Sequence, residues 1–446
     1  MMNPELRRNL WLEITPHRLL AMPLLLGLVF LAVGALARTD ASAALGWAGL
    51  TGFVLLTLVW GTRLAANAFL DEVAEKTWDW QRLSTLQPWD MTWGKLLGAT
   101  AFAWYGGLLC LAVFVVNGHA SMQAAVTQTA LTLVLLAVAA HATALLAAVH
   151  MGRKEGVKKR SPVGMLGLLV VALATVSSGL PRMLLGGSVA PQVFWYGLVV
   201  DAGHFALASA ALFAFWAVVG AYRALGQALA VRTVPYVWFG FVACVTLYTA
   251  GFAAAHAGVT PLQAVVWCAL GWTVALTYLM LFTEPSGPVA VRRVLRKLDA
   301  GQWRRAAEEM PCWPLTLMAA LACALAVHLL PGVGETAFPQ GWVVEPIAVV
   351  LMLARDAGLL LFFASAPKPQ RTVGSTLVYI VVLDWILPGT LHAVGAHGVA
   401  SLVLPLGADS VGAQGGLALL QAGLVGWLAW RRMQARLAFT QNRSVG

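Results

Sequence analysis

The 446-residue chain contains little charge and little cysteine. Only 11% of its residues are Asp, Glu, Lys or Arg, whereas 60% are hydrophobic. So little charge is not the composition of a soluble globular protein, whose surface is rich in charged residues. The five cysteines are scattered and form no C-x-x-C pair, which argues against both a disulfide framework and a metal cluster.

Motifs of catalysis and nucleotide binding are also missing. The sequence has no H-E-x-x-H zinc motif and no G-x-S-x-G nucleophile motif. Gly94 and Lys95 look like the end of a phosphate-binding loop, but Trp89 and Leu96 stand where that loop needs Gly and Ser or Thr. We therefore expect a chain that is not an enzyme and holds no metal or cofactor of its own.

The sequence consists largely of long apolar runs. They are about 20 residues long, enough for a helix to cross a bilayer, and they are continuous rather than alternating, which favours helices over a barrel. The pattern predicts an all-α polytopic membrane protein. We expect about twelve transmembrane helices, at residues 19–37, 44–69, 96–117, 122–150, 162–181, 203–222, 235–256, 262–283, 313–331, 345–366, 375–393 and 413–430.

Basic residues alternate between successive predicted loops. The loops on one side of the membrane hold only Arg38 and Arg182, and the loops on the other side hold nearly all the rest. Because cytoplasmic loops are enriched in Lys and Arg, this alternation favours the twelve-span count and cytoplasmic termini. The expected location is a bacterial plasma (inner) membrane. The net charge of +10 then reflects topology and contact with anionic lipids, and no nucleic acid is expected as a partner.

Two polar segments stand out near the N-terminus. Residues 1–18 predict an amphipathic helix lying on the membrane and ending near Pro16, with Leu6, Leu10 and Trp11 on one face. Residues 71–95 form a charged, tryptophan-rich segment that Pro88 is expected to divide into two short helices, the second continuing into the third span. Physical chemistry alone leaves two interpretations of this second segment open: an interfacial anchor, or a docking surface for a cytosolic partner.

The order of residues in this segment resembles the type 2 permease subunits of ATP-binding-cassette (ABC) exporters. The matching features are Glu75-Lys76-Thr77, Leu83, Pro88-Trp89 and Gly94-Lys95-Leu96, placed just before the third span. The opening NPELRRNLWLEITPHRL resembles the elbow helix of the same family. The resemblance covers residues 1–230, as a bundle of six spans over residues 19–230. It has two departures: Lys76 stands where Gly or a neighbour of it is usual, and Gln87 replaces Thr or Ser before the proline.

The resemblance implies that the chain is the membrane-spanning permease subunit of an ABC transporter, with export as the favoured direction. A separate ATPase subunit would then bind ATP and Mg and supply the energy. A second permease, either another copy of this chain or a different one, is a further expected partner, together with anionic lipids. Coupling to the ATPase is assigned to Glu72, Glu75, Lys76, Thr77, Arg82, Pro88, Gly94 and Lys95.

The second half of the chain, residues 231–430, repeats the plan of the first. It has paired spans, a charged segment containing VRRVLRKLDAGQWRRAAEEMPCW at 291–313, and a long outward loop before its last span. We expect a degenerate parallel repeat of six plus six spans, followed by a basic cytoplasmic tail at 431–446. An appended unrelated bundle is the alternative. The charged segment is then either a second docking element or a basic helix near anionic lipid.

Among the ionisable residues inside the predicted spans, we single out four as candidates for a functional role: His141, Arg355, Asp356 and Asp384. Such groups mark either a polar pathway or a structural lock between helices. Because adjacent residues of a helix point about 100° apart, we expect Arg355 to contact a neighbouring span in preference to Asp356. If they form a pathway, the alternative function is an ion- or proton-coupled secondary transporter. A membrane enzyme acting on lipid or isoprenoid substrates is a third class, for which no paired carboxylates or metal motif occur on an inward loop.

Overall fold

The computed structural model describes residues 3–37, 40–118, 123–152, 192–231, 235–256, 258–284, 287–330, 333, 345–366, 372–408 and 410–443. The chain divides into two compact units. The first comprises Met1–Val193 and Val199–Thr233, and the second comprises Phe194–Leu198 and Val234–Gly446.

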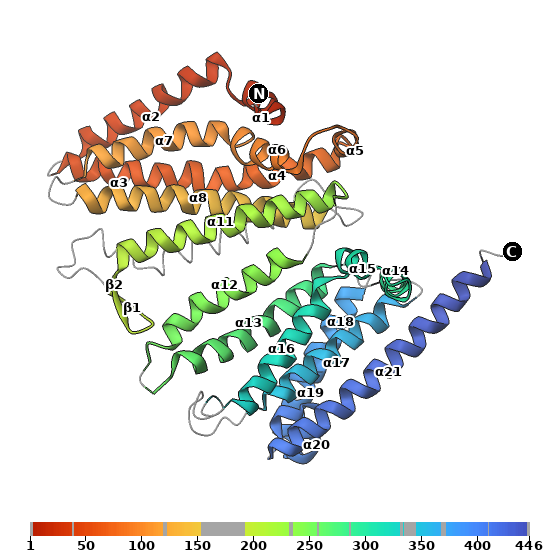
Figure 1. The fold of residues 1–446 in the computed structure, drawn as a ribbon. Helices are drawn as coiled ribbons and strands as arrows, with labels where there is room; N and C mark the ends of the chain where they lie inside the picture. The colour runs from red at the N-terminus through yellow and green to blue at the C-terminus, as the bar shows by residue number, and fades with distance from the viewer. Residues whose placement is uncertain are drawn as a thin grey trace. The chain divides into compact units, whose positions relative to one another are not determined.

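The described part of the first unit is mostly helical (Figure 1). Its described elements are α1 (Pro4–Glu13), α2 (Pro16–Leu36), α3 (Ala41–Phe53), the π-helical turn η1 (Val54–Gly61), α4 (Thr62–Ala74), α5 (Trp78–Arg82), α6 (Pro88–Trp93), the π-helical turn η2 (Gly94–Gly98), α7 (Ala101–Val116), α8 (Gln123–Gly152) and α11 (Ala202–Ala228). A two-stranded sheet, β1 (Gln192–Trp195) and β2 (Leu198–Asp201), precedes α11.

The second unit is also helical (Figure 1). Its described elements are α12 (Tyr236–Ala253), α13 (Pro261–Thr283), α14 (Pro288–Asp299), α15 (Trp303–Glu309), α16 (Cys312–Leu329), α17 (Pro346–Ala364), α18 (Thr372–Val381), the π-helical turn η5 (Val382–Ile386), α19 (Leu387–Ala393), α20 (His397–Val403), the 3-10 turn η6 (Pro405–Gly407) and α21 (Val411–Arg443).

Local sequence signals set several helix starts. Thr15 caps α2 through its side chain, and Pro16 follows at the first helical position, where a missing N–H costs nothing. Thr260 and Gln263 form a reciprocal capping box at the start of α13. The Thr15 cap and Pro16 explain why the chain leaves α1 and enters α2 at Pro16, where the sequence predicts the first helix to end.

One central helix organises the core of each unit. In the first unit α8 packs against both α4 and α11, and α3 packs against α7. In the second unit α17 packs against α16, α18 and α21. Of the described membrane-length helices, α8 and α17 are the most buried in their units. Side chains on α8 and α17 therefore face protein on most sides.

Ten described helices are long and apolar enough to cross a membrane. The count is up to eleven if Pro88–Gly98 and Ala101–Val116, bent by 51° at their junction, form one span. An all-α polytopic membrane protein is thus the architecture. Each of these helices coincides with a predicted span to within several residues at either end. The remaining predicted span, 162–181, lies outside the described residues.

Candidate functional site

The polar segment 71–95 leaves the end of α4 through a left-handed turn. Lys76 has φ of 60°, and the amide groups of Lys76 and Thr77 donate to the carbonyls of Val73 and Glu72 at 3.2 and 2.9 Å. This pair of bonds is the Schellman motif, in which glycine usually occupies the left-handed position. Lys76 therefore occupies a position with a backbone preference for glycine.

Pro88 begins a new short helix, as the sequence predicts. The helices α5 and α6 are separated by residues 83–87, and α6 continues through η2 toward α7. The path bends by 51° between the π-helical turn and α7. The segment is therefore a folded connection between two long helices rather than an extended loop.

The end of α5 carries the most exposed apolar side chains of this segment. Trp80 is 77% exposed and Leu83 is 82% exposed. Asp79 and Arg82 lie beside them and form an ion pair of 3.8 Å with both side chains in solvent. We call these four residues the α5 tip. Only Arg82 among them was predicted from the sequence as a coupling residue.

Trp78 is buried in the interior of the first unit, unlike the exposed Trp80 of the same helix. Its indole packs edge-on against Phe69 with ring centroids 4.7 Å apart, in a buried cluster that also contains Met91 and Leu145. Burying such a large side chain stabilises the packing of the segment on the bundle. Trp78 thus joins the α5 helix to the interior of the first unit.

Glu72 and Lys95 meet inside the protein. The ammonium group of Lys95 donates to a carboxylate oxygen of Glu72 and to the carbonyl oxygen of Ala68, the latter at 3.3 Å. The Lys95 side chain is only 1% exposed. The carboxylate of Glu72 also accepts from Gln81 Nε2 at 2.6 Å. These charges bind α4, α5 and η2 together, and Lys95 is too buried for a cytosolic partner to contact.

Helix α1 completes this network. Glu5 is buried and lies 3.7 Å from Lys95, and Arg8 donates to both Glu5 and Glu72 at 3.1 Å. Asn9 donates to the carbonyl of Gly94 at 3.1 Å. Glu5, Arg8, Glu72 and Lys95 carry two positive and two negative charges, so the network is balanced. We call these four residues, with Asn9, the α1 network.

Two glycines allow α1 to lie directly against η2. A β-carbon on Gly94 would collide with the side chain of Glu5, and one on Gly98 would lie 2.7 Å from the β-carbon of Asn9. The polar face of α1 carries Glu5 and Asn9 one turn apart. This face therefore lies against protein, whereas Trp11 is exposed. Of the predicted apolar face, Trp11 is exposed and Leu6 and Leu10 are half-buried, and contact of this face with a membrane stays a prediction.

The predicted coupling residues fall into two sets. Lys95 and Gly94 are buried and Glu72 is nearly so, whereas Glu75, Lys76, Thr77 and Arg82 are exposed. Pro88 supplies the start of α6. Sequence reasoning missed Glu5, Asn9 and Trp80. The first two share a face of α1 at a spacing of four, which is a signal for a polar helix contact.

His141, the polar residue of the fourth predicted span, lies on α8. Its Nε2 atom is 2.8 Å from the carbonyl oxygen of Thr57 in η1, and its ring packs edge-on against Trp104. A π-helical turn leaves some backbone carbonyls without their regular α-helical hydrogen bonds, and such turns often occur at functional sites. His141 satisfies one of these carbonyls and so joins α8 to the second span.

In the second unit, Arg355 is the centre of a buried polar cluster. Its Nε and Nη2 atoms donate to Asp356 Oδ1 at 2.9 and 2.7 Å, and Nη2 also donates to Asp384 Oδ1 at 2.7 Å. Its Nη1 atom donates to Gln421 at 2.9 Å, and Tyr278 donates to Asp356 Oδ2 at 2.6 Å. We call these five residues the Arg355 cluster. It joins α13, α17, η5 and α21.

The expected contact of Arg355 with a neighbouring span is confirmed by Asp384 and Gln421, but the expected preference over Asp356 is wrong, since Arg355 also pairs with Asp356. The long guanidinium side chain curls back to its own neighbour and still reaches Asp384 and Gln421, because its five donors point in several directions. Tyr278 and Gln421 were missed by sequence reasoning, since a lone hydroxyl or amide in an apolar run gives no signal of its partner.

The chain matches no known family, no curated protein and no solved structure. Within the described residues, no group of three or more His, Cys, Asp or Glu side chains is arranged to hold a metal ion.

Proposed function

We propose that this protein is the permease subunit of an ABC transporter, with export as its direction, and that its α5 tip docks on a separate ATPase subunit. The observation that carries the proposal is the combination of an exposed tip with a buried anchor. Trp80 and Leu83 are exposed on the protein surface, while Trp78, Glu72 and Lys95 hold the same segment to α4, α1 and η2.

This combination suits the transmission of force. A partner that moves the α5 tip acts on a segment fixed to two long helices, α4 and α7, through buried charge pairs and a packed indole. Exposed tryptophans are frequent hot spots of protein interfaces because they bury a large area with little loss of side-chain entropy. ATP and Mg would bind in the partner subunit, whose hydrolysis supplies the energy for an unidentified substrate.

The decisive experiment is capture of the ATPase by the full-length chain. The tagged protein is purified from native membranes, and a co-purifying subunit with a phosphate-binding loop is identified by mass spectrometry. The double variant Trp80→Ser/Leu83→Ser should lose most of that subunit while remaining in the membrane at normal levels. Trp11→Ser is the matched control, because Trp11 is also 77% exposed but lies on α1.

If the double variant still retains the ATPase subunit, the α5 tip is not its docking site. Equal loss with the Trp11 control would indicate an interfacial anchor. Glu72 is unsuitable for such a test, since reversing its charge would break its pairs with Lys95 and Arg8 and change the fold.

We further propose twelve spans arranged as six plus six, with both termini in the cytoplasm of a bacterial inner membrane. One support is a shared pattern between the second and third spans of each half. Trp80, Arg82 and Pro88 have the same spacing as Trp303, Arg305 and Pro311. A second support is that α8 and α17, the fourth span of each half in this count, are both the most buried described span of their unit.

Cysteine labelling tests the topology. In a cysteine-free background, a cysteine at Ser42 should react with an impermeant reagent from outside. A cysteine at Ser84 should react only after the membrane is permeabilised. The reverse pattern would overturn the proposed orientation, and labelling of both from one side would overturn the span count between them.

A second candidate function is ion- or proton-coupled secondary transport through the Arg355 cluster. It is favoured by a single observation, the presence of two carboxylates and one guanidinium within the buried part of the second unit. Transport that persists without any ATPase subunit would support it, and the variants of the cluster described below separate a pathway from a lock.

A further inference from the structure

The helices α14 and α15 form a hairpin whose two ends are fixed to membrane-length helices. Only residues 284–287 separate α13 from α14, and only residues 310–311 separate α15 from α16. The Glu284 carboxylate accepts from the amide of Cys312 at 2.6 Å and from that of Trp313 at 3.3 Å. This carboxylate closes the base of the hairpin, so α14 and α15 stay close to the point where α13 and α16 end.

Acidic residues of α15 neutralise one side of the hairpin. Glu309 pairs with Lys297 and lies 4.0 Å from Arg293, and Glu308 lies 3.7 Å from Arg304. Val294 and Ala306 are buried beneath these pairs. The inner side of the hairpin is therefore fixed by its own contacts.

The opposite face of α14 is basic. Arg292 and Arg296 lie one turn apart, and among the described residues neither has an ion-pair partner. The exposed side chains of Val289 and Leu295 flank them on the same face, within about a third of the helix circumference.

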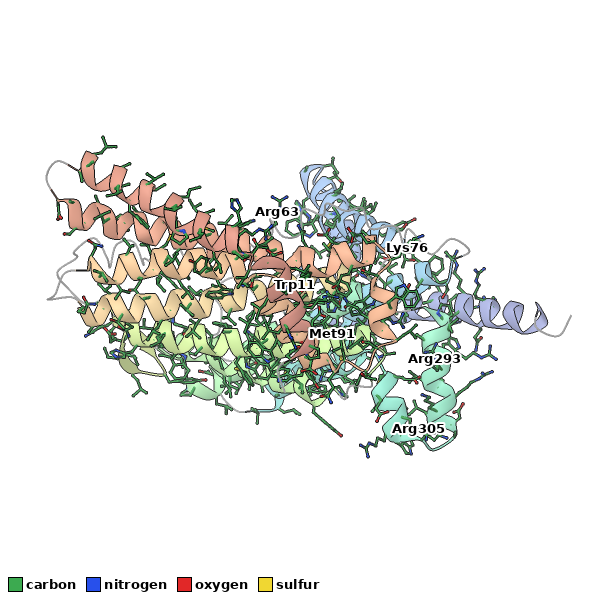
Figure 2. The ribbon with its side chains drawn as sticks, turned by 90° about the horizontal axis from the view of Figure 1, so that it is seen from above. Trp11, Arg63, Lys76, Met91, Arg293 and Arg305 are labelled. Atoms are coloured by element: carbon green, nitrogen blue, oxygen red, sulfur yellow. The ribbon has the colours of Figure 1, made fainter. Side chains whose placement is uncertain are left out.

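The start of α15 extends this surface. Trp303 is 70% exposed, and the nearby Arg305 donates to Gln302 of the same hairpin at 3.3 Å, its single hydrogen-bond partner among the described residues. Figure 2 shows the labelled Arg305 side chain extending outward from α15.

We propose that this hairpin binds the phosphate headgroups of anionic lipids at the surface of the membrane that its neighbours cross. Interleaved arginines and exposed apolar side chains are the pattern of helices that lie at a charged membrane surface. Tryptophan favours the headgroup level. The short connections keep Arg292, Arg296 and Arg305 close to the ends of α13 and α16, and charges at a membrane surface act over about 8 Å in physiological salt.

Charge distinguishes this hairpin from the segment 71–95, which has a corresponding place in the first half of the chain. Residues 288–309 contain six basic and three acidic residues, whereas residues 71–95 contain three basic and five acidic residues. Two surfaces of opposite net charge do not fit the same face of one partner. Anionic lipid complements the hairpin, and the inference does not depend on an ATPase partner.

Hydrogen exchange of the full-length protein in nanodiscs tests the proposal. Amides of residues 288–309 are compared in phosphatidylcholine and in an equal mixture of phosphatidylcholine and phosphatidylglycerol, at low and at high salt. We expect slower exchange in the anionic mixture, with the difference lost at high salt. In the triple variant Arg292→Gln/Arg296→Gln/Arg305→Gln the difference should fall by about tenfold or more, because each basic residue near the surface contributes separately.

The triple variant Arg292→Lys/Arg296→Lys/Arg305→Lys is the matched control and should keep the difference, since it preserves charge. Unchanged exchange in α13 and α16 shows that the glutamine variant is folded. Equal exchange in the two lipid mixtures would overturn the proposal, as would protection produced by inorganic phosphate without anionic lipid. Protection that appears only when a soluble acidic protein is added would assign the surface to that protein instead.

Discussion

The ammonium group of Lys95 donates to the carboxylate of Glu72, joining the π-helical turn before α7 to the end of α4. The pair lies at a junction of three chain segments, because Glu5 of α1 is 3.7 Å from the same ammonium group. Burial of these charges is tolerated because each has a partner of opposite sign. The junction fixes the base of the segment that carries the α5 tip.

Lys95→Met should destabilise the first unit by about 3–5 kcal/mol, because it removes the buried one of the two cations that Glu5 and Glu72 share and leaves only the half-exposed Arg8. The free energy of unfolding of the purified protein in detergent measures the effect. Arg82→Met, at an exposed ion pair, is the control and should change that free energy by less than about 1 kcal/mol. A small effect of both variants would show that the junction contributes little to stability.

Lys76→Gly should stabilise the protein by about 1 kcal/mol, since glycine adopts the left-handed conformation of this position without steric cost. The opposite result is expected for Glu75→Gly. Glu75 has φ of −85°, so glycine there adds only chain entropy to the unfolded state. Denaturant midpoints of the two variants provide the comparison, and a loss of stability in Lys76→Gly would contradict the assignment of strain.

Gly94→Ala should push α1 away from η2, because the added β-carbon meets Glu5. Overpacking of this kind costs about 1–3 kcal/mol. Hydrogen exchange at residues 4–13 should accelerate, whereas exchange in α8 should not. Gly27→Ala is the control, since a β-carbon added at Gly27 would meet no other atom within 4 Å. Unchanged slow exchange in α1 of the Gly94 variant would show that α1 stays packed against η2 despite the added β-carbon.

Arg355→Met should destabilise the second unit by about 3–5 kcal/mol, because it leaves Asp356 and Asp384 buried without a cation. The triple variant Arg355→Met/Asp356→Asn/Asp384→Asn removes the charges together and should recover most of that stability. If the cluster is a lock, the triple variant also transports. A folded triple variant without transport would favour a polar pathway instead.

The sequence by itself determined the class of protein and most of its helices. Apolar runs long enough for a bilayer can satisfy their backbone only as helices, so their positions follow from composition. Proline also acts locally, and for that reason the end of α1 before Pro16 and the start of α6 at Pro88 were predictable. The amphipathic pattern of α1 similarly indicated which of its faces is apolar.

Only the tertiary structure decided which polar residues meet. The contacts of Lys95 with Glu5 and Glu72, of His141 with Thr57, and of Arg355 with Asp384 join segments far apart in the chain. A local pattern does not encode such contacts, because they depend on which helices pack together and on how each is rotated. The same packing turned Trp78 inward and left Trp80 in solvent, although both are tryptophans of one short helix.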